Sequence, residues 1–436
     1  MSLNAPPGRP IAATGRQALL RQAAEGLFPG GVNSPVRAFT TVGRPPLILV
    51  SGSGSRVKDA DGNVYLDYVG GRGSAILGHA HPEVVSAVRE TALEGLALGA
   101  TGPREIELGS RIRSAMPSVE RLRFVSSGTE AVMSAVRLAR AATGRGVVVK
   151  FAGGDHGDAD SLLADAGPGL AAHAVPGSAG VTQGAAHDTI VVPFNDPAAI
   201  ATAFEAFPGR IACVIVEPVL ASVGVVPSDP GFLEFLRGLT EGDGALLIFD
   251  EVVTGFRLAR GGSQERFGIS ADLTVLSGII GGGMPVGAFG GRADLMRRVA
   301  PDGPVHQDST LAGHPVAMAA GIATLDLLTP AVYASLERVG ARLEDGLRGA
   351  AADAGRVVGI SRVGSLLTVF FRPTAPRNGG EALASDRDAY ARFFGAMLDE
   401  GILLPPSHLE PSFLGAQHSE SEIDATIVAA RKAFRA

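Results

Sequence analysis

Between about residues 75 and 325, the chain alternates short, almost entirely apolar runs with longer stretches of helical spacing. One helical stretch covers residues 130–142, and the apolar runs are 147–151, 190–194, 212–216 and 245–249. A strand that is apolar on both faces is typical of a parallel sheet with helices on both sides. The pattern therefore predicts an α/β fold built on a large, mostly parallel sheet.

The two ends of the chain have different patterns. Near the start, where Pro and Gly are frequent, residues 55–65 predict two strands around the Asp61-Gly62 turn. Near the end, helical spacing over 332–351 is followed by short apolar runs at 366–371 and 401–404 and by a flexible polar segment at 373–386. Glu422 lies three residues after Ser419, which forms the capping box of a last helix.

These changes of pattern divide the chain into three parts. We expect an N-terminal segment at 1–70, a large domain at 71–325 and a smaller C-terminal α+β domain at 326–436. A chain of 436 residues that is 46% hydrophobic is long enough to bury such a core.

Charge and hydropathy limit the classes of partner and the cellular locations to be expected. The net charge of −6 gives no concentrated basic surface for nucleic acid or an anionic membrane, so a small-molecule partner is expected. No apolar run reaches the length of about 18 residues that a membrane span needs, and residues 1–10 lack the pattern of a signal peptide. We therefore expect a cytoplasmic protein. The single cysteine, Cys213, lies in an apolar run and is expected to be a buried, inert thiol.

Three segments have the composition of a ligand site. In residues 124–130, an apolar strand ends in Ser127, Gly128 and Thr129 just before a helix, where free amides and hydroxyls suit a phosphate, although Ser and Thr are also ordinary helix caps. Asp250 follows an apolar strand, and ligands bind at the carboxyl ends of strands in open α/β sheets. A carboxylate there can keep a pyridinium nitrogen protonated. Residues 281–287 form a glycine-rich loop.

Read together and in this order, the motifs resemble those of the class III aminotransferase superfamily, which are fold-type I pyridoxal-phosphate (PLP) enzymes, and most closely the glutamate-1-semialdehyde aminomutases. The segments that carry the resemblance span nearly the whole chain and are 30–37, 77–82, 124–130, His156-Gly157, 249–257, 281–287 and Thr310-Leu311. The resemblance implies a PLP-dependent transferase fold, an amino-acid-type substrate and a homodimer with its active sites at the subunit interface.

The resemblance also implies roles for single residues. It assigns Ser127, Gly128 and Thr129 to the cofactor phosphate, which Thr310 of the partner subunit also reaches. Asp250 pairs with the pyridine nitrogen and Val252 packs on the ring. Arg37 matches the arginine that binds the substrate carboxylate, and a guanidinium can bind a carboxylate through two parallel hydrogen bonds. Glu410 matches another carboxylate of the substrate pocket.

The chain departs from these enzymes at one decisive position. The segment that carries their Schiff-base lysine reads Leu276-Ser277-Gly278-Ile279-Ile280, so Gly278 stands where the lysine belongs. Glycine can neither hold the cofactor covalently nor act as a general base. The other lysines in the chain are Lys58, Lys150 and Lys432, of which Lys150 is the nearest alternative in sequence.

Further pocket positions differ as well. Asp155 stands where the relatives have an aromatic residue that stacks on the cofactor ring, and its absence lowers the binding free energy of the cofactor by about 0.5–1.5 kcal/mol. Arg72 replaces another expected aromatic residue. His156 and His306 are the candidate proton-transfer groups. Residues of this set also have the chemistry of metal ligands, but we expect no metal, since polar pocket groups explain them equally well; they are Asp155, His156, Asp158, His306 and Asp308.

Three hypotheses remain open. The first, which we favour, is an enzyme that holds PLP or pyridoxamine phosphate (PMP) noncovalently and acts on a small amino acid or amino-carbonyl substrate. The second is a true aminomutase or aminotransferase in which the lysine was replaced, naturally or by engineering. The third is a repurposed protein of specialised metabolism that no longer uses PLP.

Overall fold

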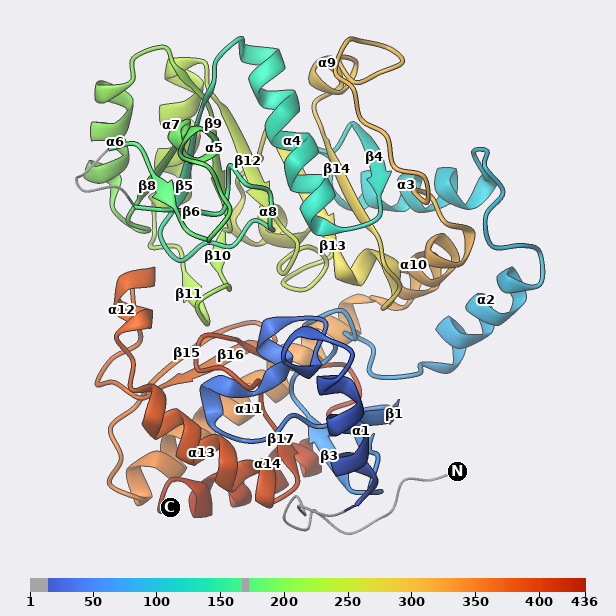
Figure 1. The fold of residues 1–436 in the computed structure, drawn as a ribbon, viewed down its shortest axis with the longest axis vertical. Helices are drawn as coiled ribbons and strands as arrows, with labels where there is room; N and C mark the ends of the chain where they lie inside the picture. Colours follow the sequence, from blue (N-terminus) through green and yellow to red (C-terminus); the bar gives the residue numbers. More distant parts are fainter. Residues whose placement is uncertain (1–14, 167–171) are drawn as a thin grey trace.

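A seven-stranded sheet forms the centre of the larger lobe (Figure 1). The computed structural model describes residues 15–166 and 172–436, so residues 1–10 and the signal-peptide question lie outside the described residues. In sheet order the strands are β4 (Arg121–Val125), β14 (Gly287–Gly291), β13 (Leu273–Ser277), β12 (Leu246–Asp250), β9 (Ile211–Val216), β5 (Val147–Phe151) and β8 (Thr189–Val192). All pairs in this sheet are parallel except the two that β14 makes with β4 and β13, which confirms the expected α/β fold with a mostly parallel sheet.

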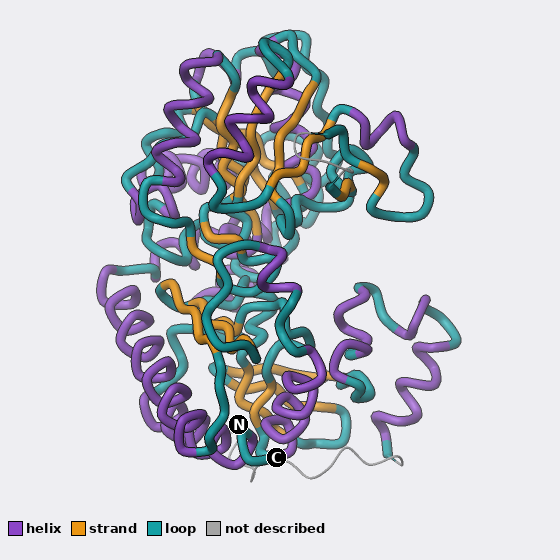
Figure 2. Tube along the Cα trace, turned by 90° about the vertical axis from the view of Figure 1, so that its left-hand side faces the viewer, coloured by secondary structure: helices purple, strands orange, loops and turns teal. Residues whose placement is uncertain are grey.

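The central strands β5, β9 and β12 are buried on both faces because most of their residues are apolar. In β5, Val148 packs in one core with α4 (Gly128–Thr143), whereas Val149 packs in a second core with α6 (Pro197–Ala206) and α7 (Phe232–Asp243). Figure 2 shows the strands of this lobe running side by side between such helices. Adjacent residues thus bury opposite faces, as expected for a covered parallel sheet.

The smaller lobe combines both ends of the chain. The expected N-terminal hairpin is present as β2 (Arg56–Asp59) and β3 (Val64–Asp67), and β3 pairs in parallel with β17 (Ile402–Leu403). Figure 1 shows these strands beside α11 (Pro330–Asp353), α13 (Arg387–Asp399) and α14 (Glu420–Ala433). The N-terminal segment therefore shares a sheet with the C-terminal region. Domain boundaries at residues 70 and 325 stay a prediction.

Local signals set several element ends. Ser419 caps α14 in a complete capping box with Glu422, as the sequence predicts. The segment 373–386, which lacked a periodic pattern, contains a helix, α12 (Gly379–Leu383), because the Asn378 side chain caps its first turn. This short element was missed since five residues are too few to show helical periodicity.

The remaining elements connect these layers. The helices are α1 (Arg16–Glu25), α2 (Pro82–Ala92), α3 (Pro103–Ala115), α5 (Gln183–His187), α8 (Gly262–Phe267), α9 (Ala293–Met296) and α10 (Pro315–Leu327). The short 3-10 helices are η1 (Pro29–Gly31), η2 (Pro35–Ala38), η3 (Thr40–Val42) and η4 (Gly278–Gly281). The strands are β1 (Leu49–Ser53), β6 (Ala164–Asp165), β7 (Val175–Pro176), β10 (Val219–Leu220), β11 (Val226–Pro227), β15 (Gly359–Val363), β16 (Leu366–Phe370) and β18 (Ser412–Phe413).

Two sequence expectations bear on single elements. Cys213 is buried in β9, and burial raises the pKa of its thiol to about 12, in agreement with an inert cysteine. In the two ranges that the structure describes, no single helix is long and apolar enough to cross a membrane; α10 and α11 meet that test only as a pair bent by 76°.

Close backbone approach makes Gly287 of β14 irreplaceable. A Cβ on Gly287 would lie 2.1 Å from the carbonyl oxygen of Ser127, so Gly287→Ala must push apart β14 and the start of α4. We expect this variant to lower the free energy of unfolding by about 1–3 kcal/mol, as overpacking does. Chemical denaturation of the purified variants measures the change.

The matched control is Gly349→Ala on the exposed side of α11, where a Cβ meets no atom within 4 Å. Here alanine should raise stability by about 0.5–1 kcal/mol, because it restricts the unfolded chain and favours the helix. Equal effects of the two substitutions would contradict this account of β14.

Candidate functional site

A cleft of about 390 Å³ opens where the carboxyl ends of β5, β9, β12 and β13 meet the start of α4. Residues from the loop after β3 close it on another side. This is the edge of an open α/β sheet at which ligands bind. The residues that line it are Gly71, Arg72, Gly73, Ser74, Gly128, Thr129, Val132, Asp155, His156, Gly157, Glu217, Ser222, Asp250, Val252, Val253, Ser277, Gly278 and Ile279.

The start of α4 has the features of an anion cradle. Ser127 is the N-cap, and its hydroxyl accepts a hydrogen bond from the amide of Glu130 at 3.2 Å. The amides of Gly128 and Thr129 come next in the helix and have no acceptor among the described residues. A Cβ on Gly128 would lie only 3.2 Å from Val252 Cγ2, so glycine keeps the cradle open. Free amides at a helix N-terminus favour a phosphate.

Asp250 and His156 form the polar centre of the cleft. Asp250 ends β12, and its Oδ2 lies 2.7 Å from Nδ1 of His156, with both side chains at least 95% buried. The second carboxylate oxygen accepts the amide of Val252 at 3.1 Å. A buried carboxylate fixed in this way presents a steady negative charge to a ligand in the cleft.

Glu217 is a site residue that the sequence reasoning missed. It follows β9 and is buried, and its carboxylate accepts hydrogen bonds from the amides of Asp155 (3.2 Å) and Ala221 (3.0 Å) and from the Ser222 hydroxyl (2.7 Å). Burial, followed by the charge of Asp250, raises the pKa of Glu217 to about 8. The signal was available, because Glu217 ends an apolar strand in the same manner as Asp250.

Gly278 lies on the wall of the cleft directly after β13. Its backbone has φ +58°, in the left-handed region that favours glycine. A Cβ built there would find its nearest atom at 3.8 Å, on Ser74, which is an ordinary van der Waals contact, so the site has room for a side-chain carbon. Neither packing nor a close approach therefore explains why this position lacks a side chain.

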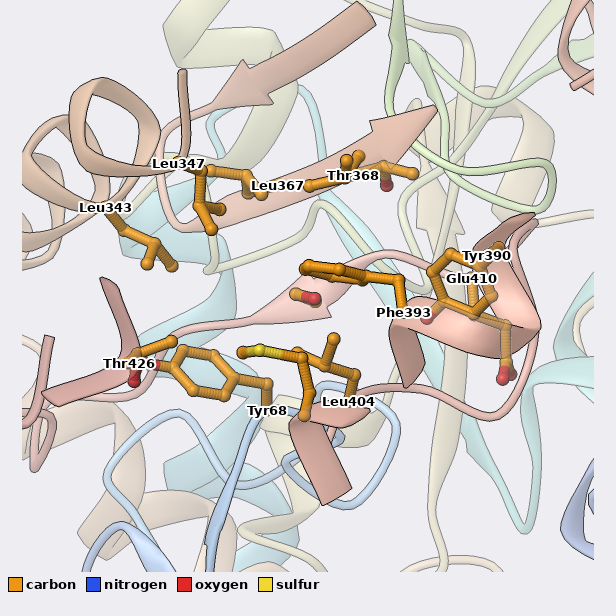
Figure 3. A pocket seen from close by; sticks show the side chains of 13 residues that line it. Tyr68, Leu343, Leu347, Leu367, Thr368, Tyr390, Phe393, Leu404, Glu410 and Thr426 are labelled. Atoms are coloured by element: carbon orange, nitrogen blue, oxygen red, sulfur yellow. Dashed lines mark hydrogen bonds between the residues drawn. The ribbon is translucent and has the colours of Figure 1, made fainter. Parts of the chain in front are cut away.

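Arg72 and Glu410 form an ion pair at the side of the cleft, 3.2 Å apart. Burial raises the pKa of Glu410, whereas the charge of Arg72 lowers it. Glu410 also borders a small enclosed cavity of about 20 Å³, large enough for one water molecule. Figure 3 shows Glu410 at the edge of this cavity, with Tyr68, Phe393 and aliphatic side chains around the rest.

Five expected site residues do not line this cleft. Ser127 lies next to it as the N-cap of α4, and Glu410 contacts it only through its ion pair with Arg72. Arg37 and His306 are exposed, and Thr310 lines a second hollow of about 460 Å³ formed by residues 96–105 and 308–315 of the same chain. The family resemblance implies that Thr310 acts on the cleft of a partner subunit, and this role stays a prediction.

Lys150 does not take the place of the lysine. Its ammonium donates to the carbonyl of Leu162 at 2.9 Å, its side chain is buried, and it does not line the cleft. Burial lowers its pKa, although the carboxylates of Asp155, Asp165 and Glu217 oppose that effect. Among residues 15–166 and 172–436, no group of three or more His, Cys, Asp or Glu side chains has the arrangement of a metal site.

Comparisons with known proteins agree with these features. The family model described as aminotransferase class III matches residues 39–416. A glutamate-1-semialdehyde 2,1-aminomutase from Sorangium cellulosum is 53% identical over 433 residues, which cover 99% of each chain.

Solved structures give the same result. An omega-transaminase from Sphaerobacter thermophilus has a TM-score of 0.90 and 32% identity, with 96% of this chain and 97% of that chain covered. A lysine-to-alanine variant of a glutamate-1-semialdehyde aminomutase from Pseudomonas aeruginosa, in complex with PMP, has a TM-score of 0.86 and 27% identity, with coverage of 96% and 94%.

The raised pKa of Glu217 predicts a pH-dependent stability. The unfolded chain ionises this group near 4.5, whereas the folded chain keeps it protonated up to about 8. Its contribution to stability is thus complete below the lower value and is lost as the pH rises through the higher one. We expect the thermal midpoint to fall between about pH 5 and pH 8, and to fall less in Glu217→Gln, which imitates the protonated acid.

Calorimetric scans across this pH range measure the difference, and Glu241→Gln, at an exposed position, is the control. A Glu217→Gln profile that runs parallel to the wild-type profile would show that Glu217 is ionised in the folded chain.

Proposed function

Because the chain belongs to the class III aminotransferase family and is homologous to glutamate-1-semialdehyde 2,1-aminomutases, we propose that it is an aminomutase-like enzyme that holds its cofactor without a covalent bond. The family and the PMP complex of a related aminomutase imply PLP or PMP as the cofactor. The substrate is a small amino acid or amino-carbonyl compound. The observation that carries the proposal is Gly278, which lies in an open part of the cleft where no side chain supplies an amine.

The residues of the cleft fit PLP or PMP at both ends of the molecule. The free amides of Gly128 and Thr129 suit the phosphate, and Asp250 suits the pyridine nitrogen. Val252, beside the cradle, offers an apolar face for the ring. When bound, this cofactor supplies an electron sink that stabilises negative charge on the substrate carbon.

A group of the chain must hold the proton that a lysine would otherwise carry. His306 does not line the cleft of its own chain, so His156 is the stronger of the two histidine candidates. His156 is oriented by Asp250, and neighbouring Glu217 is kept protonated by burial up to a pH of about 8. A histidine and a carboxyl group are the side chains most often used to accept and return a proton in general acid–base catalysis.

Arg72 is the guanidinium that lines the cleft, and we assign the substrate carboxylate to it. Arg37 is exposed and outside the cleft of its own chain, so a role for Arg37 requires a partner subunit or a movement of residues 35–38. Glu410 forms an ion pair with Arg72 and so restricts where its guanidinium lies.

A homodimer is also part of the proposal, together with a cytoplasmic location. Several apolar side chains around the second hollow are exposed, which is unusual for a surface that meets only water. Leu96, Leu98 and Leu311 expose 55%, 61% and 54% of their surface. Burial of these residues in a dimer would bring Thr310 toward the cleft of the partner.

A direct test combines cofactor binding with turnover. We expect the purified protein to bind PMP reversibly, measured by calorimetry, and to turn over glutamate-1-semialdehyde or a related amino-carbonyl compound. Gly278→Ala should leave PMP affinity within about threefold, because a Cβ meets no atom nearer than 3.8 Å and the left-handed backbone costs only about 1–2 kcal/mol. Gly278→Lys adds the amine at the same position.

The outcomes separate the three hypotheses. Turnover by the wild type with bound PMP supports the proposal. An inactive wild type that gains activity in Gly278→Lys but not in Gly278→Ala identifies a lysine-substituted aminomutase. If neither PLP nor PMP binds, the protein no longer uses this cofactor and the proposal fails.

If Thr310 contacts the cofactor phosphate in the cleft of the partner subunit, its replacement should weaken cofactor binding. Thr310→Ala should weaken PMP binding about tenfold, the effect of losing one hydrogen bond to a charged phosphate, although Thr310 does not line the cleft of its own chain. Thr101→Ala, in the same hollow, is the control and should change nothing. Unchanged PMP affinity in Thr310→Ala would contradict the shared site.

A further inference from the structure

Arg257 is a buried cation that no carboxylate of the described residues neutralises. Only 2% of its surface is exposed, and it takes part in no ion pair within those ranges. Its guanidinium donates instead to three oxygen atoms, which are the Ser365 hydroxyl (3.0 Å), the Leu414 carbonyl (3.1 Å) and the Gly73 carbonyl. Burial lowers the pKa of Arg257 to about 10. A buried charge without a counter-ion is energetically unfavourable, which raises the question of what its three hydrogen bonds hold in place.

The loop that contains Gly73 has an unusual backbone. Gly70, Gly71, Arg72 and Gly73 have φ values of 54°, 59°, 55° and 92°, all in the left-handed region. The amides of Arg72 and Gly73 donate to the carbonyls three residues earlier, so the loop is a left-handed turn. This conformation is strained for Arg72, which has a side chain, and needs external support.

Phe413 provides part of that support. The Arg257 guanidinium lies 5.1 Å from the centre of the Phe413 ring, and a Cβ on Gly73 would lie 2.6 Å from the same ring. Phe413 is therefore enclosed between the cation and the glycine loop. The carbonyl of Leu414, the next residue, accepts a hydrogen bond from Arg257.

These contacts connect the two halves of the Arg72–Glu410 pair. Arg257 binds the loop that carries Arg72 through Gly73, and it binds the segment that carries Glu410 through Leu414. We propose that Arg257 is a positioning residue that fixes the left-handed turn and thereby aims Arg72 at the substrate carboxylate. The inference rests on the proposed role of Arg72 and adds to it the group that determines where its guanidinium lies.

The alternative is that Arg257 serves the stability of the fold alone. In that case its replacement lowers the melting temperature but leaves the selectivity of the cleft unchanged. Selectivity for a charged ligand over a neutral ligand of the same shape therefore distinguishes the two roles.

The experiment compares pentanoate with pentanamide as probes of the PMP-loaded protein, using calorimetry. We expect Arg257→Lys to weaken pentanoate binding at least fivefold and to leave pentanamide and PMP binding within twofold. Hydrogen exchange at the amides of Arg72 and Gly73 should become faster, because the turn loses its support. Arg260→Lys is the matched control, since Arg260 binds the carbonyls of Leu325 and Leu328 and does not contact the loop.

Arg72→Gln keeps failure of this inference distinct from failure of the proposed function. If Arg72→Gln leaves the preference for pentanoate intact, Arg72 does not bind the carboxylate and the proposed role fails. If Arg72→Gln abolishes the preference while Arg257→Lys changes neither the preference nor the exchange rates, the positioning role is overturned. If Arg257→Lys does not fold, Ser365→Ala replaces it, because this variant removes one of the three acceptors of Arg257. It should weaken pentanoate binding about twofold and also speed up hydrogen exchange at the amides of Arg72 and Gly73.

Discussion

The buried hydrogen bond between Asp250 and His156 is the interaction on which the candidate site depends. It joins the end of β12 to the loop after β5 across the carboxyl edge of the sheet. Glu217 and Asp155 lie beside it because β9 is the strand between β5 and β12. Burial keeps Glu217 protonated, and the charge of Asp250 adds to that effect. Loss of this bond would leave a buried carboxylate and imidazole without their partners.

Much of the fold follows from patterns that act over a few residues. Wholly apolar runs such as 211–216 are buried on both faces only when helices cover both sides of the sheet, and Ser419 with Glu422 closes a helix end by a local hydrogen bond. A second rule, that ligands bind at the carboxyl ends of strands in open α/β sheets, placed Asp250 at the ligand-binding edge. Glu217 directly follows the apolar strand β9 and obeys the same rule, so its place at this edge was equally predictable from the sequence.

Other parts of the site depend on contacts between residues far apart in sequence. Nothing near Arg72 in the sequence indicates that Glu410 faces it, or that Arg257 reaches the loop through Gly73. The separation of Arg37, His306 and Thr310 from the cleft of their own chain is likewise a consequence of the three-dimensional fold. Such arrangements require the packing of both lobes, which periodicity and motif spacing do not contain.

The central claim is that a retained cofactor cleft works without a covalent lysine link. It is tested most directly by incubating the protein with PLP, reducing with borohydride and measuring the mass of the intact chain. The account predicts that the chain keeps its unmodified mass, because Gly278 offers no amine and Lys150 is bound to the Leu162 carbonyl outside the cleft. A pyridoxyl group on Lys150, Lys58 or Lys432 in a one-to-one ratio with the chain would contradict it.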